Sequence, residues 1–119
     1  MTIRVGINGF GRIGRNFFRA ARASGADFEF VAVNDLGSVK TLAFLLGNDS
    51  VHGTLDAKIR TTKDSIVVDG HKIRVFSERN PGDIPWGELN VDVVIESTGF
   101  FTARKQAALH LKGGAKKVI

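Results

Sequence analysis

The spacing of three glycines near the start of the chain constrains the fold more than any other feature. Residues 3–7 alternate between apolar and other side chains, as a short β-strand does, and Gly9, Gly11 and Gly14 follow with the pattern G-x-G-x-x-G. A helix-like pattern begins directly after them. This context predicts a strand, a tight turn and a helix, which together open a βαβ unit that binds a dinucleotide.

Each glycine has a separate predicted role. Gly9 permits the tight turn from strand to helix, Gly11 lets a pyrophosphate approach the backbone, and Gly14 allows the helix to pack closely on the strand. The diphosphate is expected at the helix N-terminus, where free N–H groups and a macrodipole of roughly half a positive charge favour an anion.

The first helix is expected over residues 11–23 and should end at Ser24-Gly25, because glycine readily adopts the left-handed conformation that closes helices. Its predicted buried stripe has the spacing i, i+4, i+7 and i+8 and consists of Ile13, Phe17, Ala20 and Ala21. The opposite face carries three arginines that are expected to be solvated, namely Arg15, Arg19 and Arg22.

A second strand is expected over residues 28–33 and ends in Asn34-Asp35. Asp35 stands 21 positions after Gly14, close to the offset of roughly 20 residues expected for an acid that binds ribose hydroxyls. Its carboxylate is predicted to accept hydrogen bonds from both adenosine ribose hydroxyls and to repel the extra phosphate of NADP. Because Leu36 offers that phosphate no donor, the pattern favours NAD over NADP.

The later part of the chain continues the α/β pattern with one departure. Further strands are expected over residues 55–61, 65–68, 71–76 and 91–95, and from residue 116 onwards. Asp69-Gly70 is a strong two-residue hairpin turn, so part of the sheet should be antiparallel. Ser38 is expected to cap a short second helix, and Thr102 a last helix that ends at Gly113-Gly114.

Four other features of the sequence carry residue types that are often functional. The acid, hydroxyl and imidazole within residues 49–53 are not predicted to be catalytic, because catalytic groups are seldom neighbours in sequence. Trp86 is interpreted as a hydrophobic lid on the sheet edge, and His110 as a partly solvated helix residue. Thr98, Gly99 and Phe101 follow a buried strand, where ligands of open α/β sheets bind.

Composition excludes several classes of protein. The 119 residues contain no cysteine, so they hold neither a disulfide framework nor a thiolate nucleophile. No window approaches the roughly 18 apolar residues of a membrane span, and the first residues do not form a signal peptide, which favours a cytoplasmic protein. The net charge of +5 is scattered and lacks interleaved aromatics, so nucleic acid is not the expected partner.

Four separated motifs resemble the N-terminal part of phosphorylating glyceraldehyde-3-phosphate dehydrogenases. They are residues 6–15 (GINGFGRIGR), 33–35 (VND), 84–87 (IPWG) and 96–102 (ESTGFFT), and the resemblance extends through essentially the whole chain. It implies a Rossmann-type doubly wound parallel sheet with an antiparallel hairpin insert. The fold is expected to be truncated before the last strand or strands and before the catalytic domain, so residues 1–119 form an incomplete dinucleotide-binding domain.

The resemblance also implies a set of cofactor-binding residues for NAD: Asn8, Gly9, Gly11, Arg12, Ile13, Gly14, Asp35, Arg79, Thr98, Gly99 and Phe101. Arg79 and Phe101 are expected near the adenine. The implied reaction is a step of glycolysis. A sugar-phosphate aldehyde is oxidised by NAD and combined with inorganic phosphate to give an acyl phosphate. The catalytic cysteine and histidine of that family do not lie in this chain, which is therefore expected to be inactive by itself. The resemblance also implies that the complete enzyme is a homotetramer.

Other interpretations predict different observations. Erythrose-4-phosphate dehydrogenase shares the fold and the chemistry, so the fold does not separate the two substrates. A stand-alone nucleotide-binding module would need a true chain end at Ile119, although the apolar run there indicates a fragment. A nucleic-acid binder would lose affinity steeply as salt rises.

Overall fold

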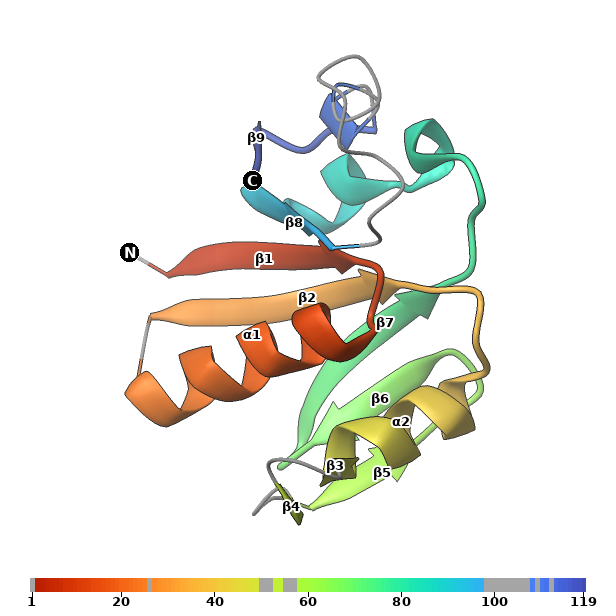
Figure 1. Ribbon diagram of the computed structural model, residues 1–119. Coiled ribbons are helices and arrows are strands. Elements are labelled where there is room, and N and C mark those ends of the chain that lie inside the picture. Colours follow the sequence, from red (N-terminus) through yellow and green to blue (C-terminus); the bar gives the residue numbers. More distant parts are fainter. Residues whose placement is uncertain are drawn as a thin grey trace.

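The computed structural model describes residues 2–25, 27–49, 53–54, 58–97, 108, 110–111 and 113–119. Its elements, in chain order, are β1 (Ile3–Asn8), α1 (Arg12–Ser24), β2 (Phe28–Asn34), α2 (Val39–Gly47), β3 (Asn48–Asp49), β4 (Gly53–Thr54), β5 (Ile59–Thr61), β6 (Ser65–Val68), β7 (His71–Phe76), the 3-10 helices η1 (Pro81–Asp83) and η2 (Trp86–Leu89), β8 (Val93–Glu96) and β9 (Lys117–Val118). Figure 1 shows a central sheet with α1 and α2 packed against it.

The main sheet has the strand order β5-β6-β7-β2-β1-β8-β9. The five strands β7, β2, β1, β8 and β9 are parallel, and in chain order they occupy the Rossmann arrangement 3-2-1-4-5. The hairpin turn at Asp69-Gly70 has positive φ at both residues, 49° and 82°. Because β7 belongs to the hairpin and to the parallel sheet, the antiparallel strands extend the sheet at one edge. The predicted fold class is confirmed.

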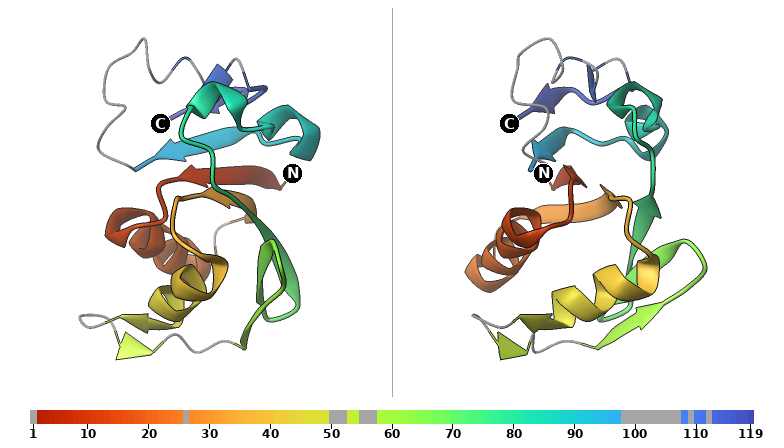
Figure 2. Two further views of the ribbon diagram at one scale, coloured as in Figure 1. Left: turned by 90° about the vertical axis from the view of Figure 1, so that its right-hand side faces the viewer. Right: turned by 45° about the vertical axis from the view of Figure 1, so that its right-hand side comes forward.

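The sheet has a hydrophobic cluster on each face. On one face, side chains of β1 and β2 such as Ile7 and Val33 pack against Phe18 of α1 and Leu46 of α2. On the other face, Ala32 and Val94 pack with residues around η1 and η2. Figure 2 shows the two long helices on one side of the sheet and the 3-10 helices on the other. The described residues contain no helix long and apolar enough to cross a membrane.

The buried stripe of α1 differs from the predicted one. The helix buries Gly14, Phe18 and Ala21, whereas Ile13 is 69% exposed and Ala20 also faces solvent. Of the predicted stripe, Ala21 is buried and Phe17 packs against the core, whereas Gly14 and Phe18 take the places expected for Ile13 and Ala20. The helix ends as predicted, with Gly25 in the left-handed conformation at φ 71°.

The arginines of α1 do not form a solvated face. Arg15 donates to the carbonyl oxygen of Phe10, and Arg19 donates to that of Leu46 at the end of α2. Arg22 forms an ion pair with Asp69 in the hairpin turn. The contacts of Arg19 and Arg22 arise because α2 and the hairpin, which come later in the chain, lie beside this face of α1, whereas Arg15 bonds the turn that precedes its own helix.

Two aromatic side chains are more deeply buried than expected. Trp86 and His110 are both 0% exposed, so neither the sheet-edge lid nor the partly solvated histidine is found. Trp86 lies over Gly6 of β1, and a Cβ added at Gly6 would stand 2.5 Å from Cζ3 of the indole. The absence of a side chain at Gly6 therefore makes room for the tryptophan in the second core.

Candidate functional site

The carboxyl ends of β1, β2 and β8 meet at one edge of the sheet, where the glycine turn joins β1 to α1. Gly9 has φ 89°, a conformation that glycine adopts without steric cost, and its N–H donates to the carbonyl oxygen of Asn34 at 2.7 Å. Gly11 is the extended residue that precedes α1, and its carbonyl accepts the first helical hydrogen bond from Arg15. The turn therefore directs the N-terminus of α1 toward this edge.

Gly11 and Gly14 have opposite surroundings. A Cβ at Gly14 would lie 2.5 Å from the carbonyl oxygen of Gly9 and 3.0 Å from Oγ of Ser97, so the close packing of helix on strand requires glycine there. A Cβ at Gly11 would meet no described atom within 4 Å. Packing within the protein therefore does not require glycine at position 11. The space beside this residue, at the start of the helix, is open.

Asp35 ties the end of β2 to the glycine turn. Its Oδ2 accepts a hydrogen bond from the Phe10 N–H at 2.9 Å, and its Oδ1 accepts one from the Gly37 N–H at 2.9 Å. The side chain is only partly buried. Each carboxylate oxygen has a further lone pair, so the group can accept additional hydrogen bonds from a ligand beside the turn.

Buried polar groups lie directly beneath this edge. Asn8 is 1% exposed and Asn34 is 5% exposed, and Nδ2 of Asn34 donates to Oδ1 of Asn8 at 2.8 Å. The Asn34 amide also bonds the backbone of Glu78 twice, accepting from its N–H at 2.8 Å and donating to its carbonyl at 2.9 Å. The side chain of Asn8, a predicted binding residue, thus faces the protein interior.

Ser97 fixes the glycine turn from β8. Its hydroxyl donates to the carbonyl oxygen of Gly9 at 2.6 Å, and its backbone N–H donates to that of Asn8 at 2.9 Å. Asn34, Glu96 and Ser97 are residues of this edge that the sequence analysis does not predict. The sequence does contain one indication of their role, because each is a polar residue at or directly after the end of an apolar strand.

Three other predicted binding residues lie around the same edge. Arg12 and Ile13 are exposed in the first turn of α1, and Arg79 is exposed in the bend that follows β7. Thr98, Gly99 and Phe101 lie outside the described residues, as do Thr102 and most of the last predicted helix. Within the described ranges, no group of three or more acidic, histidine or cysteine side chains could hold a metal ion.

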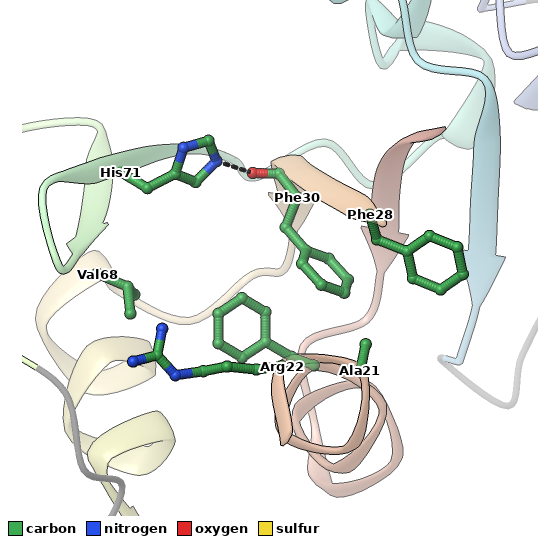
Figure 3. A pocket seen from close by; sticks show the side chains of 7 residues that line it. Ala21, Arg22, Phe28, Phe30, Val68 and His71 are labelled. Carbon is green, nitrogen blue, oxygen red and sulfur yellow. Dashed lines mark hydrogen bonds between the residues drawn. The ribbon is translucent and has the colours of Figure 1, made fainter. Parts of the chain in front are cut away.

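A hollow of about 180 Å³ lies elsewhere, between α1 and the hairpin (Figure 3). It is lined by Phe18, Ala21, Arg22, Phe28, Phe30, Val68 and His71. The His71 ring bonds the carbonyl oxygen of Phe30 at 2.9 Å, and three of the seven lining residues are phenylalanines. The hollow adjoins the start of β2 and the end of α1, so it is separate from the glycine turn.

The sequence comparisons agree with this geometry. Residues 3–104 match the family described as "Glyceraldehyde 3-phosphate dehydrogenase, NAD binding domain". The chain belongs to this family. NAD is accordingly the cofactor of the domain, as the sequence predicts.

Similar proteins are found in several bacteria. The chain is 66% identical over its full length to glyceraldehyde-3-phosphate dehydrogenase 2 of Streptomyces avermitilis, and covers 36% of that protein. It is 64% identical to the Streptomyces coelicolor enzyme and 58% identical to the Geobacillus stearothermophilus enzyme, again over its full length. In both cases it covers 35% of the relative. The 119 residues therefore span about a third of the length of these relatives.

Proposed function

We propose that residues 1–119 form the dinucleotide-binding domain of a protein that oxidises glyceraldehyde 3-phosphate with NAD and inorganic phosphate. The relatives carry the name of that enzyme, and the site described above has the features that bound NAD requires. In the complete protein, bound NAD would supply the hydride acceptor, and the residues of this chain would bind and orient it.

The observation that carries the proposal is the open space at Gly11. The diphosphate of NAD lies there, against the N-terminus of α1, whose first N–H groups have no acceptor within the helix. Gly9 and Gly14 hold the turn and the helix close to β1, which keeps this N-terminus at the carboxyl edge of the sheet. Arg12 and Ile13 border the diphosphate from the exposed first turn.

Asp35 binds the adenosine ribose. Because its two oxygens are already held by the N–H groups of Phe10 and Gly37, the carboxylate is oriented before the ligand arrives. It accepts hydrogen bonds from both ribose hydroxyls and disfavours the 2′-phosphate of NADP by charge repulsion. The 62% exposed Leu36 next to it provides no donor for that phosphate.

The remaining binding residues are assigned to the adenine or to the border of the cofactor. Arg79 and Phe101 lie near the adenine, whereas Thr98 and Gly99 border the cofactor after β8. Asn8 contributes through the backbone of the glycine turn, because its side chain is buried.

The chemical step uses residues from outside this chain. The 119 residues contain no cysteine, so a thiol nucleophile comes from the rest of the protein. We place its histidine base there too, because none of the three histidines of this chain lies in a motif of the family's catalytic histidine. We infer that the isolated chain produces no NADH, and that the complete enzyme is a cytoplasmic homotetramer.

The experiment compares NAD and NADP affinities of the complete protein before and after Asp35→Asn. Losing charge-assisted hydrogen bonds to the ribose costs on the order of 2 kcal/mol, so the preference for NAD should fall by tens-fold. Asp27→Asn, at the amino end of β2, is the matched control and should leave the preference unchanged. An unchanged ratio in Asp35→Asn would refute the assignment of this residue.

A second assay addresses the substrate. Glyceraldehyde 3-phosphate and erythrose 4-phosphate are compared by phosphate-dependent NADH production in the complete protein and in the 119-residue chain. A higher kcat/KM for erythrose 4-phosphate would replace the proposed substrate, and NADH formed by the short chain would contradict its inactivity.

A further inference from the structure

Two series of hydrogen bonds converge on the carboxylate of Glu96. Nδ2 of Asn8 donates to its Oε2 at 2.8 Å, and Nε2 of His110 lies 2.5 Å from the same oxygen. Asn34 donates to Asn8 and is hydrogen-bonded to the backbone of Glu78, and Trp86 donates to His110. The carboxylate therefore joins four side chains that come from widely separated parts of the sequence.

The direction of each bond can be assigned. The indole N–H of Trp86 can only donate, so Nδ1 of His110 accepts it, at 3.1 Å. The hydrogen of a neutral His110 ring must then be on Nε2, which donates to Glu96. The Asn8 amide is oriented in the same way, because its oxygen accepts from Asn34 while its nitrogen donates to Glu96. Asn8 and His110 therefore both donate to the same oxygen of the Glu96 carboxylate.

These groups are shielded from solvent, so the loss of one of their hydrogen bonds costs free energy that water cannot restore. The side chain of His110 is 0% exposed and that of Glu96 is 8% exposed. A buried donor without an acceptor costs roughly 1–3 kcal/mol, and a buried carboxylate needs donors in turn. A glutamine at position 96 has nearly the same shape but no charge, so its single carbonyl oxygen would accept from Asn8 and His110 more weakly than the carboxylate does.

The series through Asn8 ends on the backbone of the binding site. Asn34 holds both the N–H and the carbonyl of Glu78, the residue directly before Arg79. Asn8 is the residue directly before Gly9 of the glycine turn. The same edge is fixed by Ser97, which follows Glu96 and bonds the carbonyl oxygen of Gly9.

We propose that Glu96 is a positioning residue for the cofactor site. Its carboxylate acts through Asn8 and Asn34 to hold the glycine turn and the bend that carries Arg79 at a fixed separation. Glu96 itself contacts no cofactor. The inference rests on the proposed placement of NAD. It adds a buried residue that positions the glycine turn and the Arg79 bend without contacting the cofactor.

The test is made on the complete protein with Glu96→Gln. The NAD dissociation constant and the KM for NAD should rise about ten-fold or more, whereas kcat at saturating NAD should stay within about two-fold. A role in stability alone would lower the unfolding temperature without this separation of KM from kcat.

Glu29→Gln provides the matched control. Glu29 is a partly buried carboxylate paired with Arg4, and it lies in β2 towards the opposite end of the strands. This substitution should reduce stability but leave the NAD affinity unchanged. An equal loss of affinity in Glu29→Gln and Glu96→Gln would overturn the proposal.

Asn34→Ala decides the question if Glu96→Gln does not fold. It removes the link to Glu78 and should also raise the NAD dissociation constant. Where both variants fold, their effects on binding should be less than additive, because they interrupt one series of bonds. Affinities within two-fold of wild type would overturn the role of Glu96, whereas a wild-type protein that binds no NAD would instead refute the proposed function.

Discussion

Trp86 donates its indole N–H to Nδ1 of His110, 3.1 Å away, and neither side chain has any exposed surface. The pair links η2 to the chain segment that precedes β9, two parts of the second core. Because the indole also lies over Gly6, the contact fixes where these segments sit on β1.

Trp86→Phe should destabilise the protein by about 1–3 kcal/mol, since it leaves Nδ1 of His110 without its donor and removes buried apolar volume. Equilibrium unfolding in urea, followed by far-ultraviolet circular dichroism, measures the change. Phe76→Leu, a half-buried aromatic position packed on the same cluster, is a suitable control and should cost less. Equal losses in the two variants would show that the hydrogen bond contributes nothing.

Gly11→Ala and Gly14→Ala should separate binding from folding. At Gly14 a methyl group would lie 2.5 Å from the Gly9 carbonyl oxygen, so overpacking should cost about 1–3 kcal/mol or more. At Gly11 the methyl group meets open space, and the change in unfolding free energy should stay within about 1 kcal/mol. NAD affinity should nevertheless fall about ten-fold in Gly11→Ala, because the methyl group occupies the diphosphate's approach.

Calorimetric unfolding and NAD titration of the same two variants provide the measurement. If Gly11→Ala binds NAD as tightly as the wild type, the diphosphate does not lie against this residue. If Gly14→Ala unfolds at the wild-type temperature, the helix can move away from β1 at little cost.

Acid should weaken the attachment of the hairpin to the rest of the fold. The backbone N–H of Lys58, followed by the side chain of Arg22, lowers the pKa of Asp69 below its ordinary value of 3.8. A carboxyl group with a lowered folded-state pKa stabilises the fold at pH values above 3.8. That stabilisation is lost as the pH falls through the folded-state pKa. The free energy of unfolding should therefore decrease below about pH 4.

Asp69→Asn tests this contribution with the turn preserved. Asparagine tolerates the left-handed conformation found at φ 49°, so the hairpin should keep its geometry. Urea unfolding between pH 6 and 3 should show a shallower loss of stability in the variant, with a residual slope because the pKa values of Asp64 and Asp92 are also lowered. An identical slope in both proteins would mean that Asp69 makes no such contribution.

Much of the fold could be predicted because its first unit is encoded locally. The alternation in β1, the three glycines and the break at Gly25 all lie within 25 residues, and each reflects one backbone requirement. The hairpin could also be predicted, because Asp69-Gly70 is a preferred dipeptide of two-residue hairpin turns. The position of the glycine turn relative to Asp35 also followed from chain spacing alone.

The buried polar centre could not be predicted for a physical reason. Asn8 and Glu96 are 88 residues apart, and Trp86 and His110 are 24 apart, so their contacts exist only after the strands have assembled. The periodicity of a short helix places His110 near a face but does not show which side chain will cover it. The contacts of Arg19 and Arg22 in α1 could not be predicted for the same reason, because their acceptors lie on elements that come later in the chain.

The place of β1 in the sheet has a consequence during synthesis. β1 is made first, pairs with β2 once Asn34 has emerged, and gains its second neighbour only with β8, which begins at Val93. About 60 residues separate these two events, which at roughly 5–20 residues per second takes ~3–12 s on the ribosome. Throughout that interval, one edge of the apolar strand presents unpaired backbone groups to other nascent chains. A strand with a neighbour on each side in the folded domain thus has only one neighbour while the middle of the chain is being made.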